Sequence, residues 1–316
     1  MERRDKLLAA IDLPALTGLE VGPLNRPLVR RTDGPIVYVD HADTPALRLK
    51  YAGDPNVDID EIVEVDAVWG SGTLREAVGR NVDYVVASHV IEHVPDLISW
   101  LAEVSEVLTP RGELRLAVPD RRFTFDYNRS ETRLSDVVHA WSLKPRVPLP
   151  TSILDFCLEV GAVDPIAAWQ GAITPPSPMY GVNDALNLAK DARENGAYHD
   201  VHCWVFTPIS FARLLGRLAK LGLMNFSCEQ FFETERNSIE FIVHARRCDD
   251  AAKAAASWAD AVERLQSSKR PELAVGDGTP AEMIALLRRR EADIAALEQT
   301  VRSLSAELDE ARRQAR

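Results

Sequence analysis

The sequence predicts an α/β fold with a doubly wound, mostly parallel sheet that ends in an antiparallel strand pair. Short apolar segments recur along residues 18–119, and turns or helix-length segments separate them. Strands of this kind are buried on both faces when helices cover a parallel sheet. An amphipathic segment at 207–223 then precedes two more apolar segments, "FSCEQFFE" and "SIEFIVHARR", which are expected to pair antiparallel.

Five strands are expected in the first 120 residues. The segment "GLEVGP" ends in a Gly-Pro turn, "GPIVYVDHAD" and "DEIVEVDAVWGSG" carry carboxylates at their ends, and "VDYVVASHVIEHV" ends in a polar cluster. Apolar residues at helical spacing in "DLISWLAEVSEVL" predict a helix that "TPRG" ends in a turn. The segment "ELRLAVPD" is the fifth strand.

Regular patterns stop after Pro119, and they return at Thr207, a predicted N-cap followed by Pro208. We therefore expect a core of residues 1–120 and 207–248, with 121–206 inserted as a substrate-binding region over the carboxyl ends of the strands. The "TSILDFCLEVGA" stretch of the insertion is expected to be helical. Residues 249–280 form a helix and a linker, and 281–316 form a tail.

The tail carries a heptad-like pattern that predicts a coiled coil. The apolar positions are Met283, Leu287, Ile294, Leu297, Val301, Leu304 and Leu308. β-branched residues at one core position and leucines at the other favour two parallel strands. We therefore expect a homodimer or larger assembly through residues 281–316; the alternative is a single amphipathic helix docked on the core.

Composition excludes several classes of partner. The formal net charge is −11, which argues against a bulk electrostatic grip on nucleic acid. Apolar residues make up 46% of the chain, yet no window has the unbroken apolar run of a membrane span. The four cysteines form no CxxC pair, and Asp12 and Pro14 interrupt the apolar run that a signal peptide needs. A cytoplasmic protein that acts on small molecules or glycans is expected.

Polar side chains follow successive strands at one edge of the predicted sheet. Asp40 ends the second strand, Asp66 is expected to end the third, and Ser88 and His89 end the fourth. A carboxylate after the second strand can accept hydrogen bonds from both ribose hydroxyls, and the next can accept from an exocyclic amine. Both aspartates could instead be ordinary loop caps. Two at successive strand ends favour a nucleoside site without a phosphate cradle.

The order of these segments resembles that of the class I S-adenosylmethionine-dependent methyltransferases. The resemblance rests on "LEVGP", "VYVD", "VEVDAVWG", "VDYVVASHVIEHVPD" and "EVLTPRGELRLAVPD", and it resumes from Thr207 to Arg247. The most specific part is "SHVIEHVPD", which resembles the fourth-strand motif of small-molecule methyltransferases. The resemblance implies a Rossmann-like sheet and S-adenosyl-L-methionine as the cofactor.

The resemblance places the cofactor site at the strand ends and the turns beside them. The candidate cofactor-binding residues are Glu20, Gly22, Pro23, Asp40, His41, Asp66, Ala67, Ser88 and His89. The family pattern of acidic-x-Gly-x-Gly-x-Gly is incomplete, because Leu24 and Arg26 stand at the later glycine positions. A nicotinamide enzyme is excluded by the absence of the phosphate-binding GxGxxG motif.

Histidines in the insertion and the fourth-strand motif are candidates for acid-base chemistry. A hydroxyl acceptor needs a base, and "AYHDVHCW" offers His199, Asp200 and His202, while the motif offers His93. His199 and His202 point to opposite faces if the segment is extended and converge in a turn. A structural role for His93 and a capping role for Asp200 remain the alternatives. A divalent metal between the imidazoles of His199 and His202 is a further alternative, but no metal is assigned, because no third ligand can be identified in the sequence.

A second cluster follows the fifth strand in "PDRRFTFDYNRSETR". Its arginines suggest an anionic group on the acceptor, and its aromatic residues suggest faces for sugar rings. The candidate substrate-binding residues are Arg121, Arg122, Tyr127, Asn128 and Trp204. In the alternative interpretation the arginines pair with the acidic residues around them.

The sequence as a whole predicts an S-adenosylmethionine-dependent O-methyltransferase that modifies a hydroxyl of a sugar or glycan. In-line displacement with a histidine base is the expected mechanism. The alternative is a non-catalytic methyltransferase-like scaffold that acts through its coiled coil.

Overall fold

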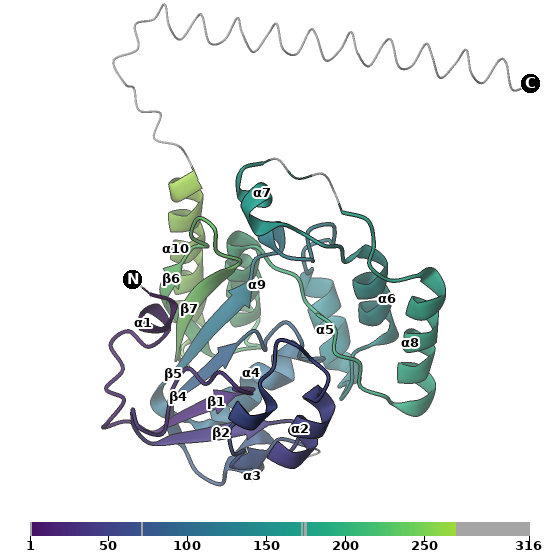
Figure 1. Ribbon diagram of the computed structural model, residues 1–316. Coiled ribbons are helices and arrows are strands. Elements are labelled where there is room, and N and C mark those ends of the chain that lie inside the picture. The colour runs from purple at the N-terminus through teal and green to yellow at the C-terminus, as the bar shows by residue number, and fades with distance from the viewer. Residues whose placement is uncertain (1, 71, 172, 174–175, 270–316) are drawn as a thin grey trace, which may run out of the picture. The chain divides into compact units, whose positions relative to one another are not determined.

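The computed structural model describes residues 2–70, 72–171, 173 and 176–269 (Figure 1). The chain divides into two units, Met1–Gln266 and Ser267–Arg316. The predicted coiled coil and most of the predicted linker lie outside the described residues. Within the described ranges, no helix combines the length and apolar character needed to cross a bilayer.

The first unit is built on one seven-stranded sheet. Its strands are β1 (Gly18–Val21), β2 (Ile36–Asp40), β3 (Ala67–Val68), β4 (Val82–Ser88), β5 (Leu108–Pro119), β6 (Phe226–Phe232) and β7 (Glu240–Arg247). Their order in the sheet is β3-β2-β1-β4-β5-β7-β6. The first five pair in parallel, and β7 pairs antiparallel with both β5 and β6. The predicted fold class is confirmed.

The remaining elements are helices, most of them in the core before β5 and in the insertion between β5 and β6. The core elements are α1 (Arg3–Leu7), α2 (Thr44–Tyr51), the 3-10 turn η1 (Ile59–Glu61), α3 (Leu74–Val78), α4 (Leu97–Val107), α9 (Pro208–Lys220) and α10 (Ala251–Lys269). The insertion contains the 3-10 turn η2 (Arg121–Phe123), α5 (Leu134–Leu143), α6 (Pro150–Glu159), α7 (Pro165–Trp169) and α8 (Val182–Asn195). The predicted helix in "TSILDFCLEVGA" is α6.

Alternating strand residues form two apolar cores, one on each face of the sheet. Val85 and Ala87 of β4 belong to the larger core, which also contains side chains of α4, α9 and α10. Tyr84 and Val86 point to the other face, where they pack with α1 and the loop after β1. This is the period-two alternation of a strand that is buried on both faces.

The second face differs from a regular doubly wound sheet, because no helix follows β1. Residues 22–35 form turns and bends. Pro23, Pro27 and Pro35 in this segment lack the backbone donor that a helix needs. The loop instead packs its apolar side chains, Leu28 and Val29, onto the sheet.

Two expected boundaries were wrong. The "TPRG" segment is part of β5, with a pairing irregularity opposite Val82 and Tyr84, and not a turn that ends α4. The third strand comprises only Ala67 and Val68, so Asp66 precedes it and does not end it. The carboxyl end of β3 leads into Trp69 instead.

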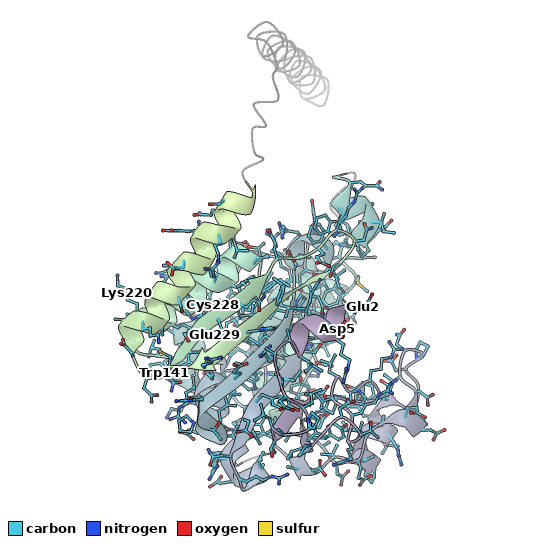
Figure 2. The ribbon with its side chains drawn as sticks, turned by 90° about the vertical axis from the view of Figure 1, so that its left-hand side faces the viewer. Glu2, Asp5, Trp141, Lys220, Cys228 and Glu229 are labelled. Carbon is cyan, nitrogen blue, oxygen red and sulfur yellow. The ribbon has the colours of Figure 1, made fainter. Side chains whose placement is uncertain are left out.

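The helix after β7 belongs to the core. Cys228 of β6 donates its backbone N–H to the hydroxyl of Ser257 at 2.8 Å, and Trp258 donates its indole N–H to the carbonyl of Phe226 at 2.8 Å. Figure 2 shows α10 beside β6, on which Cys228 and Glu229 are labelled. Trp258 is wholly buried, so α10 is fixed against the sheet by packing and by hydrogen bonds.

Candidate active site

A cavity of about 790 Å³ lies at the carboxyl ends of β1, β2 and β4. Val21, Asp40 and His89 line it from these strand ends. Lys144, Pro145, Arg146, Tyr198 and Asp200 of the insertion line its other side. In Figure 1 the insertion helices α5, α6 and α8 stand on the side to which the parallel strands point. The order of strands reverses between β1 and β4, the position where open α/β sheets bind ligands.

Sharp turns after β1 and β4 open this cavity. Gly22 and His89 both adopt the left-handed backbone conformation, with φ of 64° and 53°. A Cβ on Gly22 would meet Val90 at 3.5 Å, an ordinary contact, so the backbone conformation is what favours glycine there. Leu24, at a later glycine position of the family pattern, has φ of 48°. A left-handed conformation costs a residue that has a side chain roughly 1–2 kcal/mol relative to glycine.

Asp40 presents a nearly buried carboxylate to the cavity. Its Oδ1 accepts the backbone N–H of His41 at 2.7 Å and lies 2.6 Å from the Nδ1 of the same residue. His41 also lines the cavity, and its Nε2 lies 3.3 Å from the Nζ of Lys50. These contacts use Oδ1, so Oδ2 is the oxygen that can accept from a ligand.

Glu20, Pro23, Asp66, Ala67 and Ser88 do not line the cavity. The carboxylate of Glu20 accepts the backbone N–H groups of Leu28 and Val29 at 2.8 and 3.0 Å. Asp66 accepts the N–H of Tyr38 at 2.8 Å and pairs with Arg31 at 2.9 Å. The hydroxyl of Ser88 accepts from Arg3 at 2.5 Å. Pro23 and Ala67 are buried.

Glu20 should make stability depend on pH. Burial raises its pKa to about 7, although the two loop amides favour the carboxylate form. Because the folded-state pKa lies above the unfolded value of 4.5, this contribution is present in full below pH 4.5 and is lost as the pH rises through 7. We expect the unfolding free energy to fall by up to about 3 kcal/mol more across this range than it does in Glu20→Gln.

Urea unfolding of both proteins at pH 4.5, 6 and 8 measures this difference. The other titrating groups are common to the two proteins, so their contributions cancel in the comparison. Parallel pH profiles would show that Glu20 titrates near its ordinary pKa in the folded protein.

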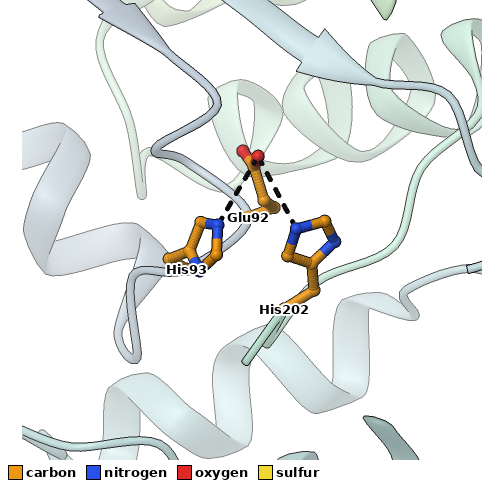
Figure 3. Close-up of side chains that lie close together, drawn as sticks. All are labelled: Glu92, His93 and His202. Atoms are coloured by element: carbon orange, nitrogen blue, oxygen red, sulfur yellow. Dashed lines mark ion pairs between the residues drawn. The ribbon is translucent and has the colours of Figure 1, made fainter. Parts of the chain in front are cut away.

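Glu92, His93 and His202 form a cluster beside the cavity (Figure 3). The Oε1 of Glu92 lies 3.9 Å from the Nε2 of His93 and 3.9 Å from the Nε2 of His202. The two imidazoles meet edge to face, with ring centroids 4.6 Å apart. His93 lines the cavity. Glu92 is wholly buried, and neither of its carboxylate oxygens has a hydrogen-bond partner.

Backbone hydrogen bonds bring His202 to this position. The N–H groups of Cys203 and Trp204 donate to the carbonyl of Glu92 at 2.7 and 3.1 Å. The indole N–H of Trp204 donates to the carbonyl of Val94 at 2.7 Å. The end of the insertion is therefore held against the loop after β4.

Each imidazole of the cluster contacts a carboxylate through Nδ1. His202 lies 2.6 Å from Asp126, and His93 lies 2.9 Å from Asp200. Burial alone would lower the pKa of His93, but Asp200 and Glu92 together raise it. The interaction with His93 lowers the pKa of Asp200 to about 2. Burial alone would raise the pKa of Asp126, but His202 and Arg129 lower it.

Asp200 does not pair with the histidine next to it in the sequence. Asp200 contacts His93, not His199. The Nε2 of His199 lies 3.0 Å from Asp191 of α8, and His199 does not line the cavity. His199 and His202 thus separate, as an extended segment predicts.

The arginines of the second cluster are held by protein groups. Arg122 pairs with Asp120, and Arg121 donates to the carbonyl of Tyr127. Asn128 donates its side-chain amide to the carbonyls of Glu159 and Pro176, at 3.3 and 2.9 Å. None of the five predicted substrate-binding residues, Trp204 included, lines the cavity. The alternative interpretation, in which the arginines are paired internally, describes these contacts better.

Several residues of the site were not identified from the sequence. Glu92 lies within the quoted "SHVIEHVPD" motif, and its central place between two histidines was the available signal. Asp126 and Arg129 lie in the second cluster. Both contact His202, which is more than seventy positions away, so no local sequence pattern predicts this role. The exposed cations that line the cavity are Lys50, Lys144 and Arg146.

No family model matches the sequence, and no curated protein matches it. Similar solved structures include an S-adenosylmethionine-dependent methyltransferase from Mesorhizobium loti, 13% identical, with 77% of this chain and 98% of that chain covered and a TM-score of 0.38. A methyltransferase from Aquifex aeolicus is 11% identical, with coverage of 78% and 89% and a TM-score of 0.35. Mitomycin 7-O-methyltransferase is 12% identical, with coverage of 78% and 53% and a TM-score of 0.37.

Other similar structures carry descriptions of different activities, a dehydrogenase and a hemolysin among them. One fold supports many activities, so function has to be argued from the site.

Proposed function

We propose that this chain is an S-adenosylmethionine-dependent methyltransferase of class I. The observation that carries the proposal is the cavity at the point where the order of strands reverses. The carboxylate of Asp40 lines this cavity, and no helix follows β1 beside it. A dinucleotide needs the amino end of that helix for its pyrophosphate. S-Adenosylmethionine carries a ribose and no phosphate, and it therefore fits the features that are present.

The lining residues fit the cofactor chemically. Asp40 is placed to accept from the ribose hydroxyls, and Gly22 lets the ligand approach the backbone. The aromatic side chains of Trp69 and Trp100 offer faces to a purine ring. The bound cofactor supplies an electrophilic methyl group on sulfur, and the residues of the chain must orient the acceptor and remove its proton.

The acceptor group we propose is a hydroxyl. Methyl transfer to a hydroxyl breaks the sulfur–methyl bond, forms an oxygen–methyl bond and releases one proton. The cluster of Glu92, His93 and His202 can activate such a hydroxyl, because His93 lines the cavity and its Nδ1 contacts Asp200. A sugar or glycan is the proposed class of acceptor. The exposed Phe125 ring, 4.7 Å from that of His202, supports it as a face for a sugar ring.

The first test is calorimetric titration of the stripped protein with S-adenosylhomocysteine. We expect micromolar or tighter binding of one equivalent. A folded sample that does not bind would contradict the proposal and favour a methyltransferase-like scaffold.

Transfer of a labelled methyl group to free hexoses, nucleotide-linked hexoses and aryl glycosides then tests the acceptor class. A simple phenol is the comparison compound. Labelling of the phenol alone would contradict the sugar assignment and leave the methyltransferase assignment intact.

Replacing His93 by glutamine should separate binding from turnover. We expect the affinity for S-adenosylhomocysteine to stay within about twofold and methyl transfer to fall by roughly 10²- to 10⁴-fold, because the acceptor hydroxyl is no longer activated. His199→Gln is the matched control, since His199 also pairs with an aspartate but lies outside the cavity. Equal losses in the two variants would remove His93 from the reaction.

A further inference from the structure

We infer that Glu92, His93 and His202 bind a first-row divalent metal ion. Two imidazole nitrogens and one carboxylate form a donor set that suits zinc and neighbouring transition metals. The candidate ligand atoms lie within 4.8 Å of one another. The inference concerns ligation alone. An ion on Nε2 of His93 would occupy the lone pair that the proposed base uses, and the charge of the ion would then have to favour loss of the acceptor proton instead.

The distances suit an ion with small adjustments. Two metal–ligand bonds of about 2.0–2.1 Å span at most roughly 4 Å. The Glu92 carboxylate lies 3.9 Å from each Nε2, close to that limit. Small rotations of the three side chains toward a common point would therefore bring the donor atoms into bonding range.

The carboxylate of Glu92 is the strongest indication of a missing partner. Its side chain is wholly buried, and both oxygens lack a hydrogen-bond donor. Buried carboxylates are normally paired, hydrogen-bonded or bound to a metal, since an unpaired charge costs several kcal/mol. The Nε2 atoms of His93 and His202 each lie 3.9 Å from its Oε1 (Figure 3), and the Nδ1 of His89 lies 3.7 Å from the same oxygen.

An outer carboxylate lies beside Nδ1 of each imidazole, within hydrogen-bond geometry at His202 and as a close ion-pair contact at His93. Asp126 lies 2.6 Å from Nδ1 of His202, and Asp200 lies 2.9 Å from Nδ1 of His93. A proton kept on Nδ1 leaves the lone pair of Nε2 free for a metal, and this carboxylate–histidine–metal arrangement is common in metal sites. Arg129 in turn holds Asp126 at 2.7 Å.

Buried charge favours a cation in the cluster. With neutral imidazoles, the charged groups in contact here are the carboxylates of Glu92, Asp126 and Asp155 and the guanidinium of Arg129, which pairs with both aspartates at 2.7 Å. A divalent ion would offset the remaining negative charge. Protons on the two histidines would do the same without a metal, and this is the competing explanation that an experiment has to separate.

The direct experiment is a titration of the chelator-treated, dialysed full chain with Zn²⁺, with Co²⁺ and Mg²⁺ in parallel. We expect one equivalent of Zn²⁺ to bind with micromolar or tighter affinity, and Mg²⁺ to bind at least 100-fold more weakly, because it prefers oxygen ligands. Bound Co²⁺ should show visible absorption bands of a nitrogen- and oxygen-ligated site. Absence of Zn²⁺ binding, or equal affinity for Mg²⁺, would overturn the inference.

Variants assign the binding to the cluster. His202→Ala and Glu92→Gln should weaken Zn²⁺ binding at least 100-fold, and Asp126→Asn by roughly 10- to 100-fold. His199→Ala is the matched control and should bind as the unaltered protein does, because its imidazole pairs with Asp191 outside the cluster. Equal affinity in all four variants would place the ion elsewhere and overturn the inference.

Two further readouts keep the result interpretable. Zn²⁺ should raise the melting temperature of the unaltered protein and of His199→Ala, and should leave that of Glu92→Gln unchanged. Circular dichroism of each variant reports whether its fold is intact, independently of cofactor binding. A folded Glu92→Gln or His202→Ala variant that retains full Zn²⁺ affinity counts against the site. Absence of methyl transfer by the unaltered protein, with normal Zn²⁺ binding, counts against the proposed function only.

Discussion

Asp40→Ala is expected to lower the affinity for S-adenosylhomocysteine by roughly 10- to 100-fold, the loss of about 1.5–3 kcal/mol from hydrogen bonds to a charged acceptor. Asp40 ends β2 and lines the cavity, and its Oδ1 is engaged by His41, which leaves Oδ2 to accept from a ligand. Calorimetric titration of the unaltered and variant proteins gives the two dissociation constants. Equal affinities would show that Asp40 does not touch the ligand.

A second substitution separates ligand contact from loop structure. Asn at position 40 can still accept the N–H of His41 through its amide oxygen, but its NH₂ group cannot accept from a ribose hydroxyl. If Asp40→Asn loses affinity as Asp40→Ala does, the contact with the ligand is responsible. If only the alanine variant loses affinity, the loop contact is responsible. Asp60→Ala removes an exposed carboxylate outside the cavity and is the matched control.

Arg129→Met is expected to lower the free energy of unfolding by roughly 3–5 kcal/mol, the usual result of leaving a buried charge without its partner. The guanidinium of Arg129 is 1% exposed and donates to Asp126 at 2.7 Å and to the carbonyl of His202 at 2.8 Å. Methionine fills similar space but leaves Asp126 without this cation. Urea unfolding followed by circular dichroism measures the change.

Two comparisons test the reason for the loss. Arg133→Met breaks the exposed pair with Asp136 and should change stability little, since water screens such pairs. The double variant Arg129→Met, Asp126→Asn should be less destabilised than the sum of its single variants, because the unpaired charge is gone. Additive losses in the double variant would mean that packing, and not charge, makes Arg129 important.

The strands of the sheet could be predicted because each is marked by a short stretch of consecutive residues. Each strand is a short apolar run, and the strand ends are marked by turn residues or by a carboxylate, as at Asp40. Asp66 was misplaced because β3 has only two residues, so the apolar pattern around it could not show on which side of the strand the carboxylate falls. The absence of a helix after β1 follows from Pro23, Pro27 and Pro35, because proline lacks the backbone N–H that a helix needs.

The candidate site was harder to predict because its contacts join distant parts of the chain. Asp126 and His202 are 76 positions apart, and no periodicity relates them. Local charge density suggested an anion site at Arg121 and Arg122, but density alone does not reveal whether guanidinium groups already have protein partners. His199 and His202 are equivalent in the sequence, and only the path of the extended segment decides which one joins His93.

The link between the insertion and the loop after β4 has a consequence for how activity is acquired. The cluster exists only when the chain near Cys203 has returned to the carbonyl of Glu92, more than a hundred residues earlier. Contacts between such distant positions form late, because a long loop must close first. A nascent or partly folded chain can therefore pair β1, β2 and β4 before it has this cluster. An intact cluster would report that the insertion has folded back onto the sheet, and pairing of the first strands alone would not.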